Sequence, residues 1–294
     1  MDKTLKRGSL EMIAAMLISG TIGWFVLVSG QSVVDVVFWR CVIGGAMLLL
    51  VCAALGLLRR ELLSRRVLVL ALVSGVAIVG NWLLLFASYS KASIAISTAV
   101  YNVQPFMLVG LAALFLGERI TLAKLAWLGV AFLGMLAIVS AHGGGTTGEN
   151  YLLGIALALG AALLYALAAL IVKRLAGTPP HLIALVQLLT GILMLAPLAS
   201  YQLPEQPQAW ASLAALGIVH TGVMYMLLYS AIQKLPTALT GALSFIYPVA
   251  AIFVDWLAFG HRLSPLQWLG VVAILLAAAG MQQGWNLSRR RLAI

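Results

Sequence analysis

The chain has very little charge. Only 9% of its 294 residues are charged, against about 25% in an average soluble domain, while 63% are hydrophobic. A soluble globule of this length needs polar side chains over its surface, and the sequence holds too few of them. A chain so rich in apolar residues is not intrinsically disordered either. These shortages leave lipid as the expected solvent of the protein.

Cysteine is also scarce, and the patterns of a catalytic or metal-binding protein are missing. Cys41 and Cys52 are the only cysteines, and the helix between them would separate them by about 16 Å, too far for a disulfide. The sequence has no cluster of histidine and cysteine at metal-ligand spacing and no Gly-x-x-x-x-Gly-Lys-Ser/Thr loop for a nucleotide. We therefore expect no enzymatic activity, no cofactor and no metal site.

Long apolar runs make up most of the sequence. About 20 apolar residues span a bilayer as an α-helix. The runs are joined by a few residues each, which leaves no room for a domain outside the membrane. They lie at residues 10–30, 34–58, 67–90, 94–116, 122–141, 152–173, 181–200, 209–232, 236–259 and 265–284. The sequence therefore predicts an all-α integral membrane protein with ten transmembrane helices.

The net charge of +10 is distributed unevenly across these helices. With the N-terminus placed in the cytoplasm, 15 of the 18 Lys and Arg residues fall on the inner side, Lys91 and Arg262 fall on the outer side, and Arg40 lies within the second helix. Cytoplasmic loops of membrane proteins carry such an excess. We therefore expect both termini in the cytoplasm. The basic residues serve topology and contact anionic lipid, and nucleic acid is not expected as a partner.

The two halves of the chain resemble each other. We expect two repeats of five helices, residues 1–145 and 146–294, with a glycine-rich seam at 142–148. Because five is odd, the second repeat enters the membrane from the opposite side. Inverted repeats are common in secondary transporters, which hold the substrate near the midplane between them; the alternative is a duplicated membrane protein without a transport role. A shift of 143 residues brings together Lys91 and Lys234, Pro105 and Pro248, Gly117 and Gly260, and Arg119 and Arg262.

A recurring motif carries a resemblance to a known family. Gly-Glu-Arg-Ile-Thr at 117–121 and Gly-His-Arg-Leu-Ser at 260–264 each follow a proline within a helix. This unit resembles the EamA-type repeat of the drug/metabolite transporter superfamily, and the resemblance covers the whole chain. Within the superfamily the chain is most similar to the bacterial aromatic amino-acid exporter branch. One departure is that Glu118 of the first repeat is matched by His261 in the second, so a symmetric pair of carboxylates is absent.

The resemblance implies a function. It implies a secondary transporter that exports small zwitterionic metabolites, aromatic or apolar amino acids above all, across the bacterial inner membrane by alternating access. We expect a monomer whose partners are its small-molecule substrate and membrane lipid. The alternative is an uncoupled facilitator or channel-like exporter of other neutral metabolites or drugs, and the dependence of flux on a pH gradient would distinguish the two.

Polar and aromatic residues deep in the helices mark the expected substrate cavity. Polar side chains within the hydrocarbon are costly and face the protein interior, and a buried Tyr or Trp needs a partner for its O–H or N–H. Small residues and single hydroxyls also serve helix packing, which is the alternative interpretation. The fifth and tenth helices have almost no polar interior residue, so we expect them at the periphery. The expected substrate-binding residues are Trp24, Asn81, Tyr101, Gln104, Tyr165, Tyr225, Ser244 and Tyr247.

Two prolines and two charges are candidates for hinges and gates. Pro105 and Pro248 occupy matching positions, where each removes a backbone hydrogen bond and bends its helix, as a gating hinge or as a static kink. Arg40 and Asp255 lie at similar depth, so we expect them to pair as a structural clamp or an outer gate. The rest of the cavity is expected to be neutral, which suits a zwitterion with an apolar side chain.

His220 is the expected candidate for proton coupling. It lies close to the middle of the eighth helix and is the side chain there that titrates near neutral pH. The alternative is a neutral histidine, hydrogen-bonded in the core.

Overall fold

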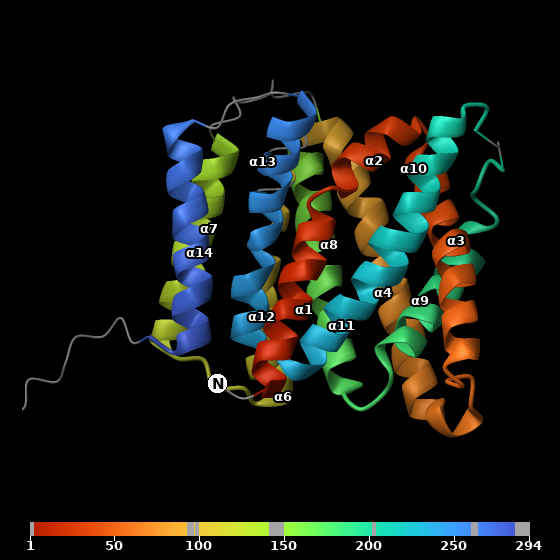
Figure 1. The fold of residues 1–294 in the computed structure, drawn as a ribbon, viewed down its shortest axis with the longest axis horizontal. Coiled ribbons are helices and arrows are strands. Elements are labelled where there is room, and N and C mark those ends of the chain that lie inside the picture. Colours follow the sequence, from red (N-terminus) through yellow and green to blue (C-terminus); the bar gives the residue numbers. More distant parts are fainter. Residues whose placement is uncertain are drawn as a thin grey trace, which may run out of the picture.

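The chain folds into a bundle of helices. The computed structural model describes residues 3–92, 97, 100–140, 150–201, 204–259 and 264–285. Within these residues the regular structure is helical throughout, and the helices stand side by side with roughly parallel axes (Figure 1).

Ten helical segments follow the ten apolar runs in order, which confirms the all-α fold with ten helices predicted from the sequence. Seven contain one labelled helix each: α3 (Val33–Ala54), α4 (Arg65–Ala92), α6 (Gln104–Leu116), α7 (Leu122–Ser140), α8 (Tyr151–Arg174), α9 (Pro180–Leu195) and α14 (Pro265–Gln283). Three contain two labelled helices: α1 (Lys3–Ser19) with α2 (Ile22–Ser29), α10 (Pro207–Gly217) with α11 (Met224–Lys234) through the π-helical residues Ile218–Val223, and α12 (Thr237–Ser244) with α13 (Ile246–Phe259).

Helix length and surface composition suit a bilayer. Five segments are long and apolar enough to cross a membrane, and five more are apolar helices of 10–17 residues. Large apolar side chains cover the outside of the bundle, where Leu50, Leu152 and Leu193 are 72%, 79% and 76% exposed. Such a surface is unfavourable in water. The outside of the bundle is therefore the part that faces lipid.

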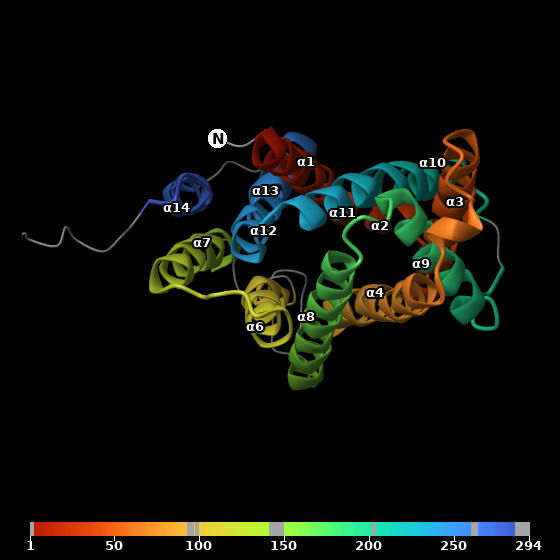
Figure 2. The ribbon, with the colours of Figure 1, turned by 90° about the horizontal axis from the view of Figure 1, so that it is seen from below.

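The helices form two unequal cores. The larger core gathers buried side chains from α1, α3, α4, α8, α9 and α11. The smaller core lies between α7, α12 and α14, where Leu128, Phe245 and Ile274 are fully buried. Seen along the helices, α7 and α14 lie together at one end of the bundle (Figure 2). This is the peripheral position expected for the two helices that have almost no polar interior residue.

The helices that carry the paired prolines are interrupted shortly before each proline. The chain leaves helical geometry at 102–103, ahead of Pro105, and again at Phe245, ahead of Pro248. A proline has no N–H, so the carbonyl four residues earlier lacks its helical partner. Those carbonyls belong to Tyr101 and Ser244. Pro105 therefore lies in the first turn of α6 and Pro248 in the first turn of α13, so neither proline is in mid-helix.

Candidate functional site

A cavity lies inside the bundle, between helices of both halves of the chain. Seen along the helices, α4, α6 and α8 lie on one side and α1, α11 and α12 on the other (Figure 2). The cavity lies between them, and residues of α2, α3 and α13 also line it. None of the described lining residues belongs to α7, α9 or α14.

Most of the residues selected from the sequence for substrate binding meet at this cavity. They come from five separate helical segments, and their polar groups would be costly to bury without an internal space or partner. The lining includes Asn81, Tyr101, Gln104, Tyr165, Tyr225, Ser244 and Tyr247. Pro105 and Pro248 are adjacent in sequence to the lining residues Gln104 and Tyr247. The roles of these residues in binding and gating stay predictions.

Trp24 is the exception, and its expected orientation must be corrected. Its side chain is 36% exposed, and its ring meets the ring of Phe25 edge-on rather than lining the cavity. Gly23, the residue before it, does line the cavity. Ile22 of the same helix lines the cavity as well, and Trp24 is not among the lining residues.

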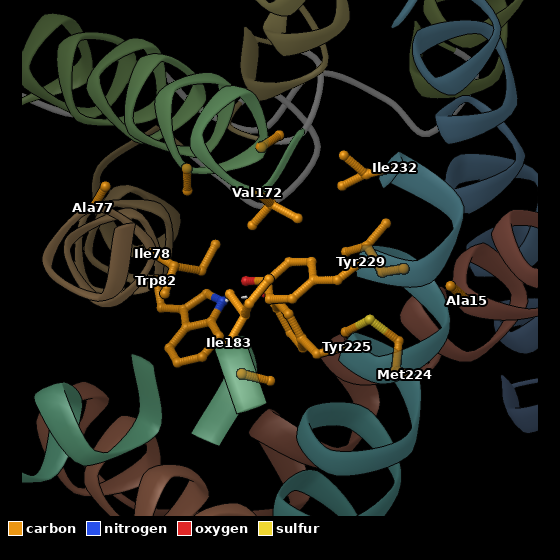
Figure 3. Close-up of a cluster of buried hydrophobic side chains, with 14 of the residues drawn as sticks. Ala15, Ala77, Ile78, Trp82, Val172, Ile183, Met224, Tyr225, Tyr229 and Ile232 are labelled. Atoms are coloured by element: carbon orange, nitrogen blue, oxygen red, sulfur yellow. Dashed lines mark hydrogen bonds between the residues drawn. The ribbon is translucent and has the colours of Figure 1, made fainter. Parts of the chain in front are cut away.

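Aromatic rings and an amide form much of the wall. The indole N–H of Trp82 donates to the hydroxyl of Tyr225 at 2.9 Å, and the two rings meet edge-on (Figure 3). Next to Trp82 on α4, Asn81 Nδ2 donates to the carbonyl of Ala161 at 2.8 Å and to the hydroxyl of Tyr101 at 3.3 Å. These bonds fix the side chains that frame the space, so the site is preformed.

Arg40 also lines the cavity, and this corrects the expectation of a neutral site. The side chain extends from the middle of α3 and is 1% exposed. Its Nε donates to Thr221 Oγ1 at 3.1 Å, and its Cζ lies 4.5 Å from the centre of the Trp82 ring. The sequence showed a charge within an apolar helix but not the neighbours that it meets in the fold. The expected partner, Asp255, has a side chain outside the described part of the structure.

A π-helical segment positions Thr221, the hydrogen-bond partner of Arg40. Between Ile218 and Val223 the chain adds one residue per turn, and the hydroxyl of Thr221 donates to the carbonyl of Leu216, five residues earlier. Short π-helical insertions occur frequently at functional sites. Here the insertion turns Thr221 toward α3, where its hydroxyl oxygen accepts from Arg40.

His220 is buried beside the cavity without lining it. It is 2% exposed, and both ring nitrogens have hydrogen-bond partners: Nε2 meets the hydroxyl of Thr21, and Nδ1 meets the carbonyl of Ala215 at 3.0 Å. The imidazole also packs against the ring of Phe25. This arrangement ties α11 and its π-helical segment to the break between α1 and α2. A role in proton coupling stays a prediction.

Charged side chains join the helices at the end of the bundle that carries the N-terminus, and sequence reasoning missed this network. Lys173 Nζ lies 2.8 Å from Glu118 Oε1 and donates to Thr237 Oγ1 at 2.7 Å. Lys234 Nζ lies 2.6 Å from Glu11. The signal was available, because these acids and bases sit at the same ends of apolar runs in a chain with few charges. Their pairing depends on which helices are neighbours, which the sequence does not state.

Glu118 is held in its charged form. Partial burial raises the pKa of Glu118, but the hydrogen bonds and the charge of Lys173, with the hydrogen bonds of Thr237, outweigh this effect. The pKa of Glu118 therefore lies below its ordinary value. Along α8, α11 and α12 the network lies six to eight residues from the cavity, roughly 10 Å at 1.5 Å per residue. It ties the helices together at that end of the bundle.

Comparisons with known proteins agree in matching this chain to membrane transporters. A model of the EamA-like transporter family matches residues 6–140 and again residues 152–282. The uncharacterized transporter YxxF of Bacillus subtilis is 28% identical over 272 residues, which cover 92% of this chain and 88% of that protein. The threonine/homoserine exporter RhtA of Escherichia coli K12 is 28% identical over 211 residues, 70% of this chain and 68% of that exporter. A protein of known crystal structure has the same fold, with a TM-score of 0.80 at 22% identity over 92% of this chain and 96% of its own.

Proposed function

The chain belongs to the EamA-like transporter family, and from this premise we propose that it is a secondary transporter exporting small zwitterionic metabolites, foremost amino acids with aromatic or apolar side chains. We place it in the bacterial inner membrane with both termini in the cytoplasm. The two regions matched by the family model hold five helical segments each, which supports two inverted repeats working by alternating access.

The observation that carries the proposal is the composition of the cavity. Aromatic rings, amide side chains and serine hydroxyls line the cavity, and Arg40 adds one positive charge. Rings offer an apolar surface to an apolar side chain, while polar groups fix the orientation of a ligand. The exporter RhtA is named for threonine and homoserine, which supports an amino acid as cargo.

Flux through the purified protein in liposomes tests the proposal. Labelled Phe, Trp and Thr and a cationic dye are compared in the same vesicles, with protein-free liposomes as the control. We expect saturable flux of Phe and Trp, slower flux of Thr, and none of the dye, because a buried positive charge repels a cation. Dye flux without amino-acid flux would contradict the proposal.

The same vesicles separate coupled export from the alternative of an uncoupled facilitator. An imposed pH gradient accelerates flux only in the coupled case. His220→Ala should then abolish this acceleration and keep downhill exchange. Equal flux with and without the gradient would favour the facilitator and make His220 a core histidine, in keeping with its two hydrogen-bond partners.

A further inference from the structure

The guanidinium of Arg40 is the feature of the cavity that sequence patterns leave unexplained. It lies in the membrane-spanning part of α3, lines the cavity and is 1% exposed. A buried charge is costly unless other groups pair with it or hydrogen-bond to it. Among the residues that the structure describes, no Asp or Glu lines the cavity.

Two neighbours hold the guanidinium in place and leave one of its edges unused. Thr221 accepts from Nε, and the face of Trp82 stacks on the guanidinium carbon at 4.5 Å. Within the described part of the chain, Nη2 of Arg40 is buried without a hydrogen-bond partner. Trp82 is itself fixed by its bond to Tyr225. The donor is therefore oriented, desolvated and unpaired at the wall of a cavity.

We infer that Arg40 binds the carboxylate of the transported ligand, so that a free carboxylate is the feature the site requires. This inference rests on the proposed function and narrows its substrate class. A guanidinium offers donors in a planar fork that matches a carboxylate, and bonds between two charged groups are the strongest of their kind. The ligand would supply the negative charge that the described wall lacks.

The other end of the ligand meets a different surface. Tyr101 and Tyr165 approach each other edge-on with ring centres 6.2 Å apart, and Tyr225 stands on the side of Arg40. An apolar or aromatic group fits this surface. For an amino group, the described wall offers neutral acceptors but no carboxylate. We therefore expect the amino group to contribute less than the carboxylate, so that an aromatic acid without an amine still binds.

A ligand series on the unmodified protein tests the inference directly. Flux of labelled Phe in liposomes is inhibited with unlabelled Phe, phenylalaninamide, 3-phenylpropionate or 2-phenylethylamine. We expect Phe and 3-phenylpropionate to inhibit, and the amide and the amine, which lack a carboxylate, to need about 10- to 100-fold higher concentrations. Equal inhibition by Phe and its amide would overturn the inference while leaving amino-acid transport intact.

Substitutions at Arg40 test whether this residue causes the preference for a carboxylate. Arg40→Gln should raise the half-saturating concentration of Phe about 10- to 100-fold and remove the preference for Phe over its amide. Arg40→Lys should restore part of this preference, because it keeps the charge but loses the planar fork and the stacking on Trp82. The matched control is Arg174→Gln, which removes an exposed guanidinium outside the cavity and should change neither value.

Other outcomes of these experiments would also support or overturn the role of Arg40. If Arg40 only pairs with Asp255, then Asp255→Asn and Arg40→Gln should impair flux alike and leave the preference for Phe over its amide unchanged, which would overturn the inference. If Arg40→Gln does not fold, the ligand series on the unmodified protein decides alone. If the unmodified protein moves no amino acid, the proposed function fails. Binding of 3-phenylpropionate and of its amide, followed by tryptophan fluorescence, then still tests Arg40.

Discussion

At the scale of single residues, two tyrosines on α11 have different surroundings: Tyr225 lines the cavity, and Tyr229 lies in the core. The hydroxyl of Tyr225 accepts from Trp82 at the cavity, whereas the hydroxyl of Tyr229 donates to Gln187 Oε1. Gln187 in turn donates from Nε2 to Ser74 Oγ at 2.8 Å, in a part of the core where it is 2% exposed. The two tyrosine hydroxyls therefore form hydrogen bonds in different places, one at the cavity wall and one in the core.

Replacing each tyrosine by phenylalanine should give opposite patterns. Tyr225→Phe leaves the N–H of Trp82 without its acceptor at a cavity where water can replace it, so we expect about 1 kcal/mol or less of lost stability but several-fold weaker binding of Phe. Tyr229→Phe leaves Gln187 Oε1 without its hydrogen-bond donor in the core, outside the cavity. We therefore expect about 1–3 kcal/mol of lost stability and unchanged binding of Phe. Thermal unfolding in detergent and half-saturation of flux measure the two effects.

Each variant is the control of the other. Loss of stability without loss of affinity in Tyr225→Phe would show that this hydroxyl belongs to the core and not to the wall.

Residue type and depth predicted most of the cavity wall but not its charge. Tyr101, Asn81 and Ser244 could be selected because deep polar groups must face the interior. The failure at Trp24 has a local cause, since a break between α1 and α2 changes the helical phase that decides which side chain faces inward. Arg40 was visible as a buried charge, but its position over Trp82 follows from how α3 and α4 lie in the fold.

At the scale of helices, α4 and α8 lie side by side (Figure 2), and their close approach supports one side of the cavity. A Cβ atom added at Gly154 would lie 2.5 Å from Cβ of Ala92 and 2.8 Å from its backbone N. Small residues permit such approach between membrane helices, where lipid gives no hydrophobic driving force for association. Asn81 and Tyr165 reach the cavity from these two helices.

Gly154→Leu should therefore disrupt the site from a distance. We expect a loss of stability of about 1–3 kcal/mol or more from overpacking, together with reduced flux. The matched control is Gly110→Leu in α6, because Gly110 is exposed and nothing lies within 4 Å of an added Cβ there. That variant should keep or slightly raise stability, since leucine favours a helix over glycine by somewhat less than 1 kcal/mol. Thermal unfolding of both variants in the same detergent compares them, and equal losses would contradict the role given to this contact.

The existence of the helices could be predicted from the sequence, whereas the π-helical interruption of the eighth could not. Apolar runs of the right length specify a membrane helix whatever its internal geometry. The π-helical residues Ile218–Val223 change only the local hydrogen bonding, and they leave no mark on the apolar pattern of the eighth run. The breaks ahead of Pro105 and Pro248 were signalled by the prolines themselves.

At the scale of the whole molecule, the charged network at the N-terminal end connects the two halves of the chain. Lys173 and Thr237 belong to the second half, and Glu118 belongs to the first. Glu11 of the first half meets Lys234 of the second. If the halves move relative to each other during transport, these ion pairs must break when that end opens. We therefore expect these pairs to hold this end closed, with a contribution from Glu118.

The pH dependence of this closure follows from the lowered pKa of Glu118. A carboxylate with a pKa lower in the closed form than in the released form stabilises the closed form above its ordinary pKa, and this stabilisation is lost as the pH falls through the lowered value. An ordinary Glu titrates near about 4.3. The Lys173–Glu118 pair should therefore remain intact from about pH 8 down to about pH 5, so changes of pH in that range do not open this end through Glu118.

Glu118→Gln removes the charge at every pH and should shift the molecule toward the state that is open at this end. The readout is the labelling rate of Leu228→Cys, at the cavity wall, by a membrane-impermeant thiol reagent, in a background with Cys41→Ala and Cys52→Ala. We expect labelling several-fold faster than in the parent from the side that carries the N-terminus, and no change from the other side. Glu61→Gln removes the same charge from an exposed turn after α3 and should label like the parent. Equal rates in Glu118→Gln and the parent, or a parent that already labels rapidly at pH 6, would show that the network does not close this end.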